Sequence, residues 1–418
     1  MLVSYYFVMT LPRSLSNSNI QNLQMQVQTL DDKITRFLNN KFRISRSYAT
    51  KRTYESALKQ FEKFLQISYG LNLIQLLQKI KVSKELDSIE VLDEYYTFLS
   101  QYKRPGKDRP GYCAVSIKNY LKVAKEFLNG EGCKIYNEDV KQRFRLPRVV
   151  VAYQKGLTKE TINRLVRLAN PKLVACILVA CSSGMRLGEI VQLKLSDIDL
   201  TTNPTTIIIR ADTTKTREAR LTHFSSEATN ALKDYLIRLN PPKKNDDYVF
   251  LLQHKDRIKM AKHDNRSDRI ENLESQLESM TPEERYAKSV ATTCHNLQQQ
   301  LARIIKDNPE LNKKTENDRN EIHFHAFRYF FKTQVTDAHQ SDFAEALMGH
   351  KSLKLVYYRQ NEKARAQTYL GVEHAVTIAD TEKIDENYSE LQKDNLELRG
   401  IVDNLSRNLR DIEKRISV

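Results

Sequence analysis

The sequence predicts a mainly α protein with a small antiparallel β-sheet, an α+β fold. Only 11 glycines and 10 prolines occur in 418 residues, about half of their usual share, so turns are few and helices are long. Apolar residues recur at steps of three and four through most of the chain, as on the buried face of a helix. One stretch, residues 205–224, is instead rich in β-branched residues and has the pattern of a hairpin.

The charge balance favours a polyanionic partner. Lysine and arginine number 67 against 52 acidic residues, a net charge of +15. Basic side chains that neutralise phosphates release condensed counterions. We therefore favour a role of this charge in binding nucleic acid over a role in solubility alone. No apolar run approaches the ~20 residues that span a bilayer, so we expect an intracellular protein with no membrane contact. The five cysteines form no C-x-x-C pair, and neither a disulfide framework nor a metal site is expected.

Residues 1–45 predict a helical arm. Its apolar residues alternate at steps of three and four: Ile20, Leu23, Val27, Leu30, Ile34 and Phe37. So short a heptad pattern fits either a helix that pairs with another chain or a helix that packs on its own domain.

Residues 46–145 predict a helical domain with a basic surface. Three amphipathic patterns, which include Tyr54, Leu92 and Ile117, mark its core. Its candidate DNA-binding cations are Lys51, Arg52, Lys59, Lys103, Arg104, Lys107, Arg109, Lys118 and Lys122. A single charged stretch is usually a solvated face, but several in one domain favour nucleic-acid binding.

Residues 146–156 predict a linker, and residues 157–375 predict a second domain. A helix is expected to start at Thr158, and the apolar run 173–180 predicts a buried helix. Strands are expected at 205–210, 217–224 and 248–252. A charged helical insertion is expected over 255–288, followed by a helix over 296–306.

Residues 380–418 predict a coiled coil. Leu391, Leu398, Leu405 and Ile412 occupy d positions, and Asn395, Val402, Leu409 and Ile416 occupy a positions. An Asn in the seam favours a parallel pair in register, because an unpaired amide there is costly. The alternative is an amphipathic helix that folds back on its own domain, but a homo-oligomer is the interpretation we favour.

Two short clusters carry candidate chemistry for an anion. In residues 181–190 a helix ends at a small-residue turn and Arg186 opens the next helix, where a guanidinium and free N–H groups can bind two oxygens. Glu189, one turn on, can hold Arg186 in place. His325 and Arg328 lie three residues apart and share one helix face.

A third cluster ends one helix at Gly349-His350 and places Tyr357 and Tyr358 after it. Taken in order, the motifs resemble the tyrosine recombinase (integrase) family of DNA strand-exchange enzymes. The matching elements are Gly-Met-Arg186-Leu-Gly-Glu189, a hairpin lysine, His325-x-x-Arg328, Met-Gly-His350 and a tyrosine. The resemblance covers roughly residues 46–370, and the insertion and the Tyr-Tyr-Arg ending are similar to archaeal chromosomal or viral integrases.

The resemblance implies a helical core-binding domain, a catalytic domain and a role for each site residue. Arg186 and Arg328 would clamp the scissile phosphate, and Glu189 would support Arg186. Lys215 would protonate the departing 5′-oxygen, His325 would assist proton transfer, and His350 would hydrogen-bond the phosphate. A tyrosine, whose hydroxyl has a pKa of about 10, would attack phosphorus once the cationic pocket favours its phenolate.

The nucleophile itself has three candidates. The usual family gap from the histidine to the tyrosine is nine residues, whereas Tyr358 lies eight residues after His350 and Tyr357 seven. We favour Tyr358, with Tyr357 in reserve and Tyr369 as a distant third. Tyr329 stands where many relatives have a second histidine.

The resemblance implies double-stranded DNA as the partner and a C-shaped clamp that acts as a synaptic tetramer. We expect no cofactor and no metal, because the cations supply the charge stabilisation that a metal supplies elsewhere. A cytoplasmic, nucleoid-associated protein is expected. Two alternatives remain: a catalytically silent DNA-binding or architectural protein of the same fold, and a coiled-coil scaffold that bridges DNA.

Overall fold

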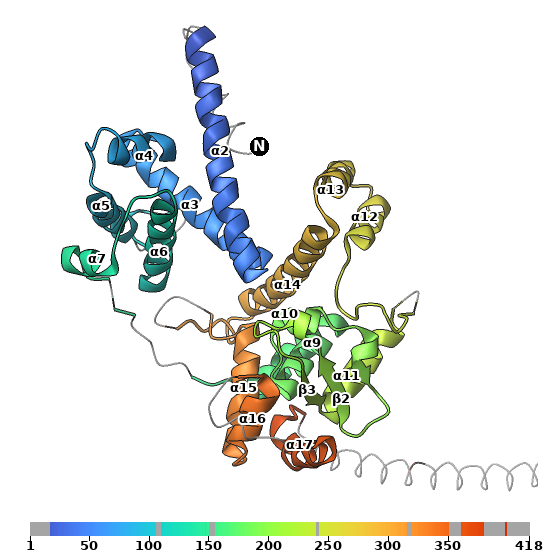
Figure 1. Ribbon diagram of the computed structural model, residues 1–418. Coiled ribbons are helices and arrows are strands. Elements are labelled where there is room, and N and C mark those ends of the chain that lie inside the picture. The colour runs from blue at the N-terminus through green and yellow to red at the C-terminus, as the bar shows by residue number, and fades with distance from the viewer. Residues whose placement is uncertain are drawn as a thin grey trace, which may run out of the picture. The chain divides into compact units, whose positions relative to one another are not determined.

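Figure 1 shows the computed structural model of the chain. The structure describes residues 17–105, 110–146, 148–149, 155–239, 242–315, 320–350, 361–379 and 398, with the backbone alone for 17–30. The chain divides into two compact units, residues 1–151 and 152–418, and each has its own hydrophobic core. The division falls within the predicted linker segment, 146–156. No helix in the described ranges is long and apolar enough to cross a membrane.

Within its described residues the first unit contains helices and no strands. Its helices are α2 (Asn17–Ser45), α3 (Tyr48–Tyr69), α4 (Leu73–Lys81), α5 (Ser88–Gln101), α6 (Ala114–Gly130) and α7 (Asn137–Arg143). Polar caps start several of them: the Ser47 hydroxyl accepts from the Thr50 N–H, and Asn72 caps α4. Aromatic rings fill the core, where Phe61 lies 4.9 Å from Tyr95, centroid to centroid.

Helix α2 packs on its own unit in its C-terminal half. Leu38 is buried, and Ile34 and Phe37 lie against the same core. The Phe37 ring meets the ring of Phe127 in α6 edge to face, 5.4 Å between centroids. For these residues the structure therefore favours packing within the domain over pairing with another chain. The side chains of Ile20 to Leu30 are outside the described residues.

The second unit combines helices with a three-stranded sheet. Its helices are α8 (Lys159–Leu168), α9 (Pro171–Ser183), α10 (Leu187–Val191), α11 (Ser226–Ile237), α12 (His254–His263), α13 (Ser267–Ser279), α14 (Pro282–Asp307), α15 (Phe324–Asp337), α16 (Ser341–Met348) and α17 (Glu362–Val376). Short 3-10 helices cover Leu195–Asp197 and Ala211–Thr213. The strands are β1 (Ile198–Asp199), β2 (Thr205–Ile209) and β3 (Arg220–Phe224).

The sheet is antiparallel in the order β1-β2-β3, and Ile207 faces Thr222 in its register. Ile207 and Ile209 are buried while Ile208 is exposed, which is the alternation of a sheet with one covered face. The predicted hairpin is confirmed, and the mainly α fold with a small antiparallel sheet is confirmed with it. The predicted strand at 248–252 is wrong: only Tyr248 forms a β-bridge, with Lys194. Val249, Phe250 and Leu251 are buried in succession, so this apolar run fills the core as irregular backbone.

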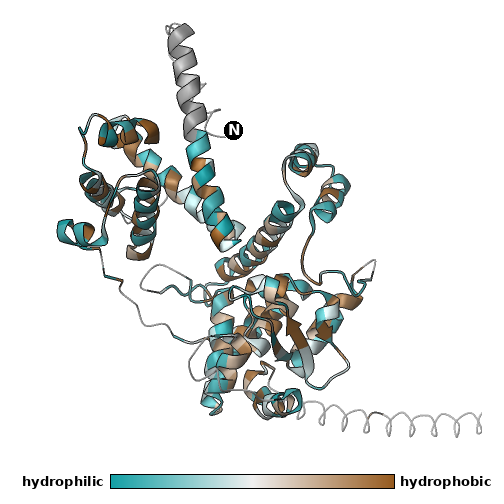
Figure 2. Cartoon of the chain, viewed as in Figure 1, coloured by the Kyte–Doolittle hydropathy of each residue, from teal (hydrophilic) through white to brown (hydrophobic). Residues whose placement is uncertain are grey.

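Helix α9 is the centre of the second unit. It begins at the Asn170 cap with Pro171 in its first turn, and nearly every residue from Leu173 onward is buried. It packs against α11, α15 and β3, and Figure 2 shows it and β2 as hydrophobic. The predicted buried helix at 173–180 is therefore confirmed, and its C-terminal end places the Ser183-Gly184 turn at the site described below.

The charged segment 255–288 contains α12, α13 and the start of α14. The helix predicted over 296–306 begins earlier, at Pro282, because Thr281 and Glu284 form a reciprocal capping box. Its buried face continues toward the N-terminus through Thr293 and Ser289. Because these two residues are polar, the spacing of apolar residues in the sequence does not show that the helix extends this far.

His223 provides a pH-dependent contribution to stability. It is buried beside the Tyr369 ring, 5.3 Å between centroids, and burial lowers its pKa from 6.5 to about 4. In the unfolded chain His223 therefore binds a proton below about pH 6.5, whereas in the folded chain it binds one only below about pH 4. One pKa unit corresponds to ~1.4 kcal/mol, so the free energy of unfolding should fall by up to about 3 kcal/mol as the pH falls through this window.

Denaturant unfolding of wild type and His223→Gln between pH 7 and pH 4.5 measures this contribution. The wild-type free energy of unfolding should fall more steeply with acid than that of the variant. Identical slopes in the two chains would rule out His223 as the source.

Candidate active site

Arg186 opens helix α10 with its guanidinium held by a buried carboxylate. Its Nη1 donates to Glu189 Oε1 at 3.0 Å, and its backbone N–H donates to Glu189 Oε2 at 2.9 Å. The side chain of Glu189 is 2% exposed, whereas that of Arg186 is 29% exposed. The Arg186 guanidinium is therefore held by Glu189 on its Nη1 side, and the exposed part of the group is open to a ligand.

Glu189 also binds Arg220, which the sequence analysis did not select as a site residue. Arg220 Nη1 donates to Glu189 Oε1 at 3.2 Å and Nη2 to Oε2 at 2.6 Å, a bidentate pair. Burial raises the pKa of Glu189, but the hydrogen bonds and charges of Arg220 and Arg186 outweigh it and hold the pKa below its usual value. Glu189 is thus an ionised carboxylate shared by two guanidinium groups.

Arg328 is buried at the meeting point of three segments. It donates to the carbonyl of Gly184 after α9, and its Nη2 donates to the Met348 carbonyl at the end of α16 and to His350 Nε2, both at 2.9 Å. Burial lowers the pKa of Arg328 to about 10, and the charges of Arg186 and Arg220 act in the same direction while Glu189 opposes them. The group is still a cation at neutral pH.

His350 is oriented by a carboxylate on the preceding helix. Glu345 Oε2 lies 2.5 Å from Nδ1, and Nε2 faces Arg328 Nη2, so the network assigns a proton on Nδ1 to the bond with Glu345. Gly349 permits this placement, because it ends α16 in the left-handed region at φ 69°. Glu345 also pairs with Lys332. Burial opposes ionisation of Glu345, but Lys332 and His350 keep its pKa lowered.

His325 lies in the first turn of α15, one turn before Arg328. It is exposed, and its ring meets Tyr329 edge to face with centroids 4.6 Å apart. Burial of part of the ring lowers its pKa first, and the charges of Arg328, His323 and Arg186 lower it further. His325 is therefore neutral at pH 7 and belongs to the same electrostatic cluster.

Lys215 is exposed in the turn that precedes β3. Within the described residues no hydrogen bond or ion pair joins it to the four residues Arg186, His325, Arg328 and His350. The structure thus brings those four together with Glu189 and leaves Lys215 on the adjacent hairpin.

Of the candidate tyrosines, Tyr357 and Tyr358 fall outside the described residues. Tyr369 is fully buried in α17, and its hydroxyl donates to the Ser182 carbonyl at 2.7 Å. Burial raises its pKa well above the usual value. A phenol committed to the core in this way cannot reach a DNA strand, which is consistent with its low rank among the candidates.

The predicted cations of the first unit are placed unevenly. Lys59 pairs with Glu55 at 2.7 Å and Lys122 with Glu126 at 3.8 Å, one helical turn apart in each case. Arg104 lies over the Tyr112 ring, 4.9 Å from its centroid. Arg52 and Lys103 are exposed, Lys51 and Lys118 are half-buried, and Lys107 and Arg109 are outside the described residues.

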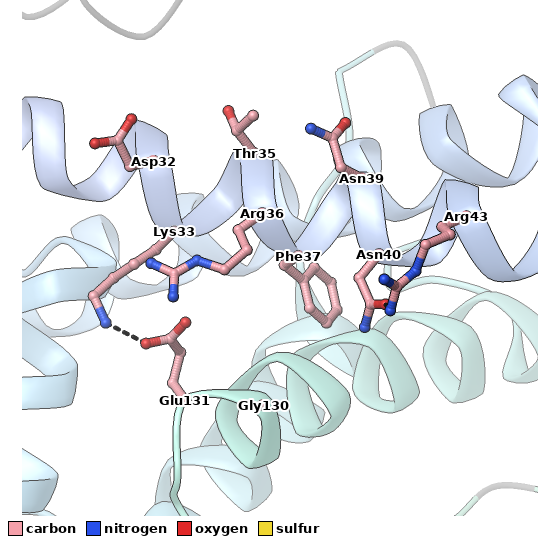
Figure 3. A pocket seen from close by; sticks show the side chains of 10 residues that line it. All are labelled: Asp32, Lys33, Thr35, Arg36, Phe37, Asn39, Asn40, Arg43, Gly130 and Glu131. Carbon is pink, nitrogen blue, oxygen red and sulfur yellow. Dashed lines mark hydrogen bonds and ion pairs between the residues drawn. The ribbon is translucent and has the colours of Figure 1, made fainter.

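A polar groove on this unit was not predicted. It runs between α2 and the end of α6, has a volume of about 700 Å³, and includes the exposed Arg36 and Arg43 (Figure 3). Lys33 in the same groove pairs with Glu131. The prediction for residues 1–45 rested on their apolar positions, as a helix that pairs with another chain or packs on its own domain, so the cations on the other faces of α2 were not among the candidates.

The predicted seam of the coiled coil lies almost entirely outside the described residues. Leu391, Asn395, Val402, Leu405, Leu409 and Ile412 are outside the described residues, and Leu398 alone is described, as an exposed residue.

The described residues of the second unit form a cluster of opposite charges around Arg328. Three guanidinium groups, those of Arg186, Arg220 and Arg328, gather around two carboxylates, Glu189 and Glu345. Within the described residues no group of three His, Cys, Asp or Glu side chains could hold a metal ion. Preorganised donors of this kind stabilise negative charge that develops on an oxygen or a phosphoryl group.

A model of the phage integrase family matches residues 155–365. No curated protein matches the sequence significantly.

Solved structures of recombinases are similar at low identity. The crystal structure of XerA recombinase is 19% identical, with 81% of this chain and 97% of that chain covered and a TM-score of 0.31. XerH bound to its difH substrate in a pre-cleavage complex is 16% identical, with 87% and 91% covered and a TM-score of 0.45. The Tn1549 transposon integrase with transposon right end DNA is 13% identical, with 75% and 98% covered and a TM-score of 0.40.

The family model spans just over half of the 418 residues and includes Arg186, His325, Arg328, His350 and the preceding hairpin. The resemblance drawn from the order of the motifs is confirmed. The chain belongs to the phage integrase family, that of the tyrosine recombinases.

Proposed function

We propose that the chain cleaves and rejoins double-stranded DNA at specific sites through a covalent 3′-phosphotyrosyl intermediate, without a metal ion. The supporting observation is that Arg186, His325, Arg328 and His350, which are far apart in the sequence, share one cationic site. Positive charge gathered at one place in this way favours binding of an anion.

The two arginines bind the scissile phosphate. Arg186 offers its exposed edge, because Glu189 occupies only Nη1 and the backbone N–H. Arg328 adds a buried charge whose field is weakly screened. A phosphate oxygen would accept from Arg328 Nη2 in place of His350 Nε2, and His350 would then hydrogen-bond the same phosphate.

Proton transfer involves the remaining residues. The Tyr358 oxygen attacks phosphorus while the bond from phosphorus to the 5′-oxygen breaks, so one phosphodiester is exchanged for another and religation needs no outside energy. The lowered pKa of His325 keeps the ring neutral and able to accept the phenol proton. Lys215 donates a proton to the departing 5′-oxygen from the exposed hairpin turn.

Assembly and DNA contact complete the proposal. Exposed cations of the first unit, Arg52 and Lys103 with Arg36 and Arg43 of the groove, bind the phosphate backbone without reading sequence. Residues 380–418 pair chains as a coiled coil, and four chains assemble on two DNA sites. The protein acts at the chromosome in the cytoplasm.

A catalytically silent DNA-binding or architectural protein is the second candidate, and a coiled-coil scaffold that bridges DNA is the third. The intact cluster of Arg186, His325, Arg328 and His350 favours the enzyme over both, since binding of the DNA backbone alone does not require two histidines beside paired arginines.

Trapping of a covalent adduct tests the proposal. The chain is incubated with EDTA and a pool of nicked duplexes with randomised centres, on which cleavage releases a short fragment and traps the enzyme. Wild type should give a covalent protein–DNA adduct on a denaturing gel. Tyr358→Phe should give none, and Tyr357→Phe should behave as wild type. Absence of any adduct from wild type, together with ordinary DNA binding, would favour the silent binder.

A further inference from the structure

We infer that Arg220 is a positioning residue of the strand-cleaving site: it occupies Glu189 so that Arg186 keeps its charge free for the DNA phosphate. The inference rests on the proposed function.

All three nitrogens of the Arg220 guanidinium are committed within the protein. Nη1 and Nη2 bind Glu189, and Nε donates to the Leu347 carbonyl at 2.8 Å. The side chain is 8% exposed. A guanidinium used in this way supports other groups and has little left to offer a ligand.

The carboxylate of Glu189 is divided between two cations. Each of its oxygens accepts from both arginines: Oε1 from the Nη1 groups of Arg186 and Arg220, and Oε2 from the Arg186 N–H and Arg220 Nη2. Without Arg220, Arg186 is the one cation among the described residues that is still hydrogen-bonded to the buried carboxylate. The carboxylate would turn fully onto Arg186, form the bidentate pair itself and cancel the charge that the phosphate needs.

Arg220 also links the carboxylate to the segment that carries His350. Its stem crosses directly over Gly349, where an added Cβ would lie 2.8 Å from Arg220 Cδ and 3.1 Å from Nε. Its Nε bond to Leu347 ties β3 to the end of α16, one residue before the Met348 carbonyl that Arg328 binds. The Arg220 side chain thus connects three parts of the site. These are the carboxylate that holds Arg186, the end of α16 that precedes His350, and the strand that follows the Lys215 turn.

A double-mutant cycle with Glu189 tests the inference. The rate of adduct formation at saturating DNA and the DNA dissociation constant are measured for wild type, Arg220→Gln, Glu189→Gln and the double variant. Arg220→Gln should lower the rate about 100-fold, the scale of losing one preorganised donor, and change the dissociation constant by less than about threefold. The double variant should form the adduct at least about tenfold faster than Arg220→Gln, because the neutral amide that replaces the Glu189 carboxylate does not form an ion pair with Arg186.

Two further variants separate charge from folding. Arg220→Lys keeps a cation on Glu189 and should fall between wild type and Arg220→Gln, with an unchanged melting temperature. Arg238→Gln removes one exposed charge at the end of α11 and should match wild type.

The outcomes distinguish this inference from the proposed function. An active wild type with a double variant as slow as Arg220→Gln, or with Arg220→Gln at the wild-type rate, would overturn the positioning role alone. A wild type that forms no adduct would overturn the proposed function and this inference together.

Discussion

Arg328→Ala is expected to lower the rate of strand cleavage by at least about a thousandfold, the range seen when an arginine that stabilises a phosphoryl transition state is removed. Arg328 is the most buried cation of the site, and its charge acts where water screens it least. The single-turnover rate of adduct formation at saturating DNA measures the loss.

Arg328→Lys is the matched control for charge. Lysine keeps the positive charge but cannot reach the Gly184 and Met348 carbonyls and His350 at once. It should remain cleavage-deficient, about 100-fold below wild type, with a smaller loss of melting temperature than the alanine variant. An alanine variant that cleaves within tenfold of wild type would remove Arg328 from the chemistry.

Gly184→Ala is expected to lower the free energy of unfolding by about 2–5 kcal/mol. Gly184 ends α9 at φ 63°, in the left-handed region that costs an L-residue ~1 kcal/mol or more. An added Cβ would lie 2.5 Å from Phe331 Cδ1 and 2.9 Å from Met348 Cγ, so α15 or α16 must move, and overpacking adds ~1–3 kcal/mol. Denaturant unfolding measures the change.

Gly188→Ala is the control on the same segment. Gly188 lies inside α10, and nothing stands within 4 Å of the position of its Cβ. Alanine there should leave stability unchanged or raise it by up to ~1 kcal/mol. Equal losses in the two variants would show that the α9 turn is not the cause.

The sequence was most informative where chemistry imposes spacing. Arg186 with Glu189 and His325 with Arg328 are each three residues apart, and a short spacing on one helix is readable without a structure. The hairpin and the buried helix α9 were readable because β-branched and apolar residues form continuous runs there. Glycine positions at the ends of α9 and α16 were also marked by the sequence.

Long-range contacts could not be read in this way. Arg220 meets Glu189 across 31 residues and Leu347 across 127, and no local pattern distinguishes it from an ordinary strand residue. The run 248–252 has strand composition but no partner strand, so tertiary packing overrides its propensity. In α14, buried Ser289 and Thr293 conceal a helix face that only the surrounding core reveals.

Mass spectrometry of the peptide that remains attached to the trapped DNA strand tests the strand-cleaving chemistry most directly. The 3′-phosphate should be found on Tyr358, eight residues after His350, with no attachment to a serine or to Tyr369. Attachment through any residue other than a tyrosine of the segment 351–360, or DNA held without a covalent bond, would contradict it.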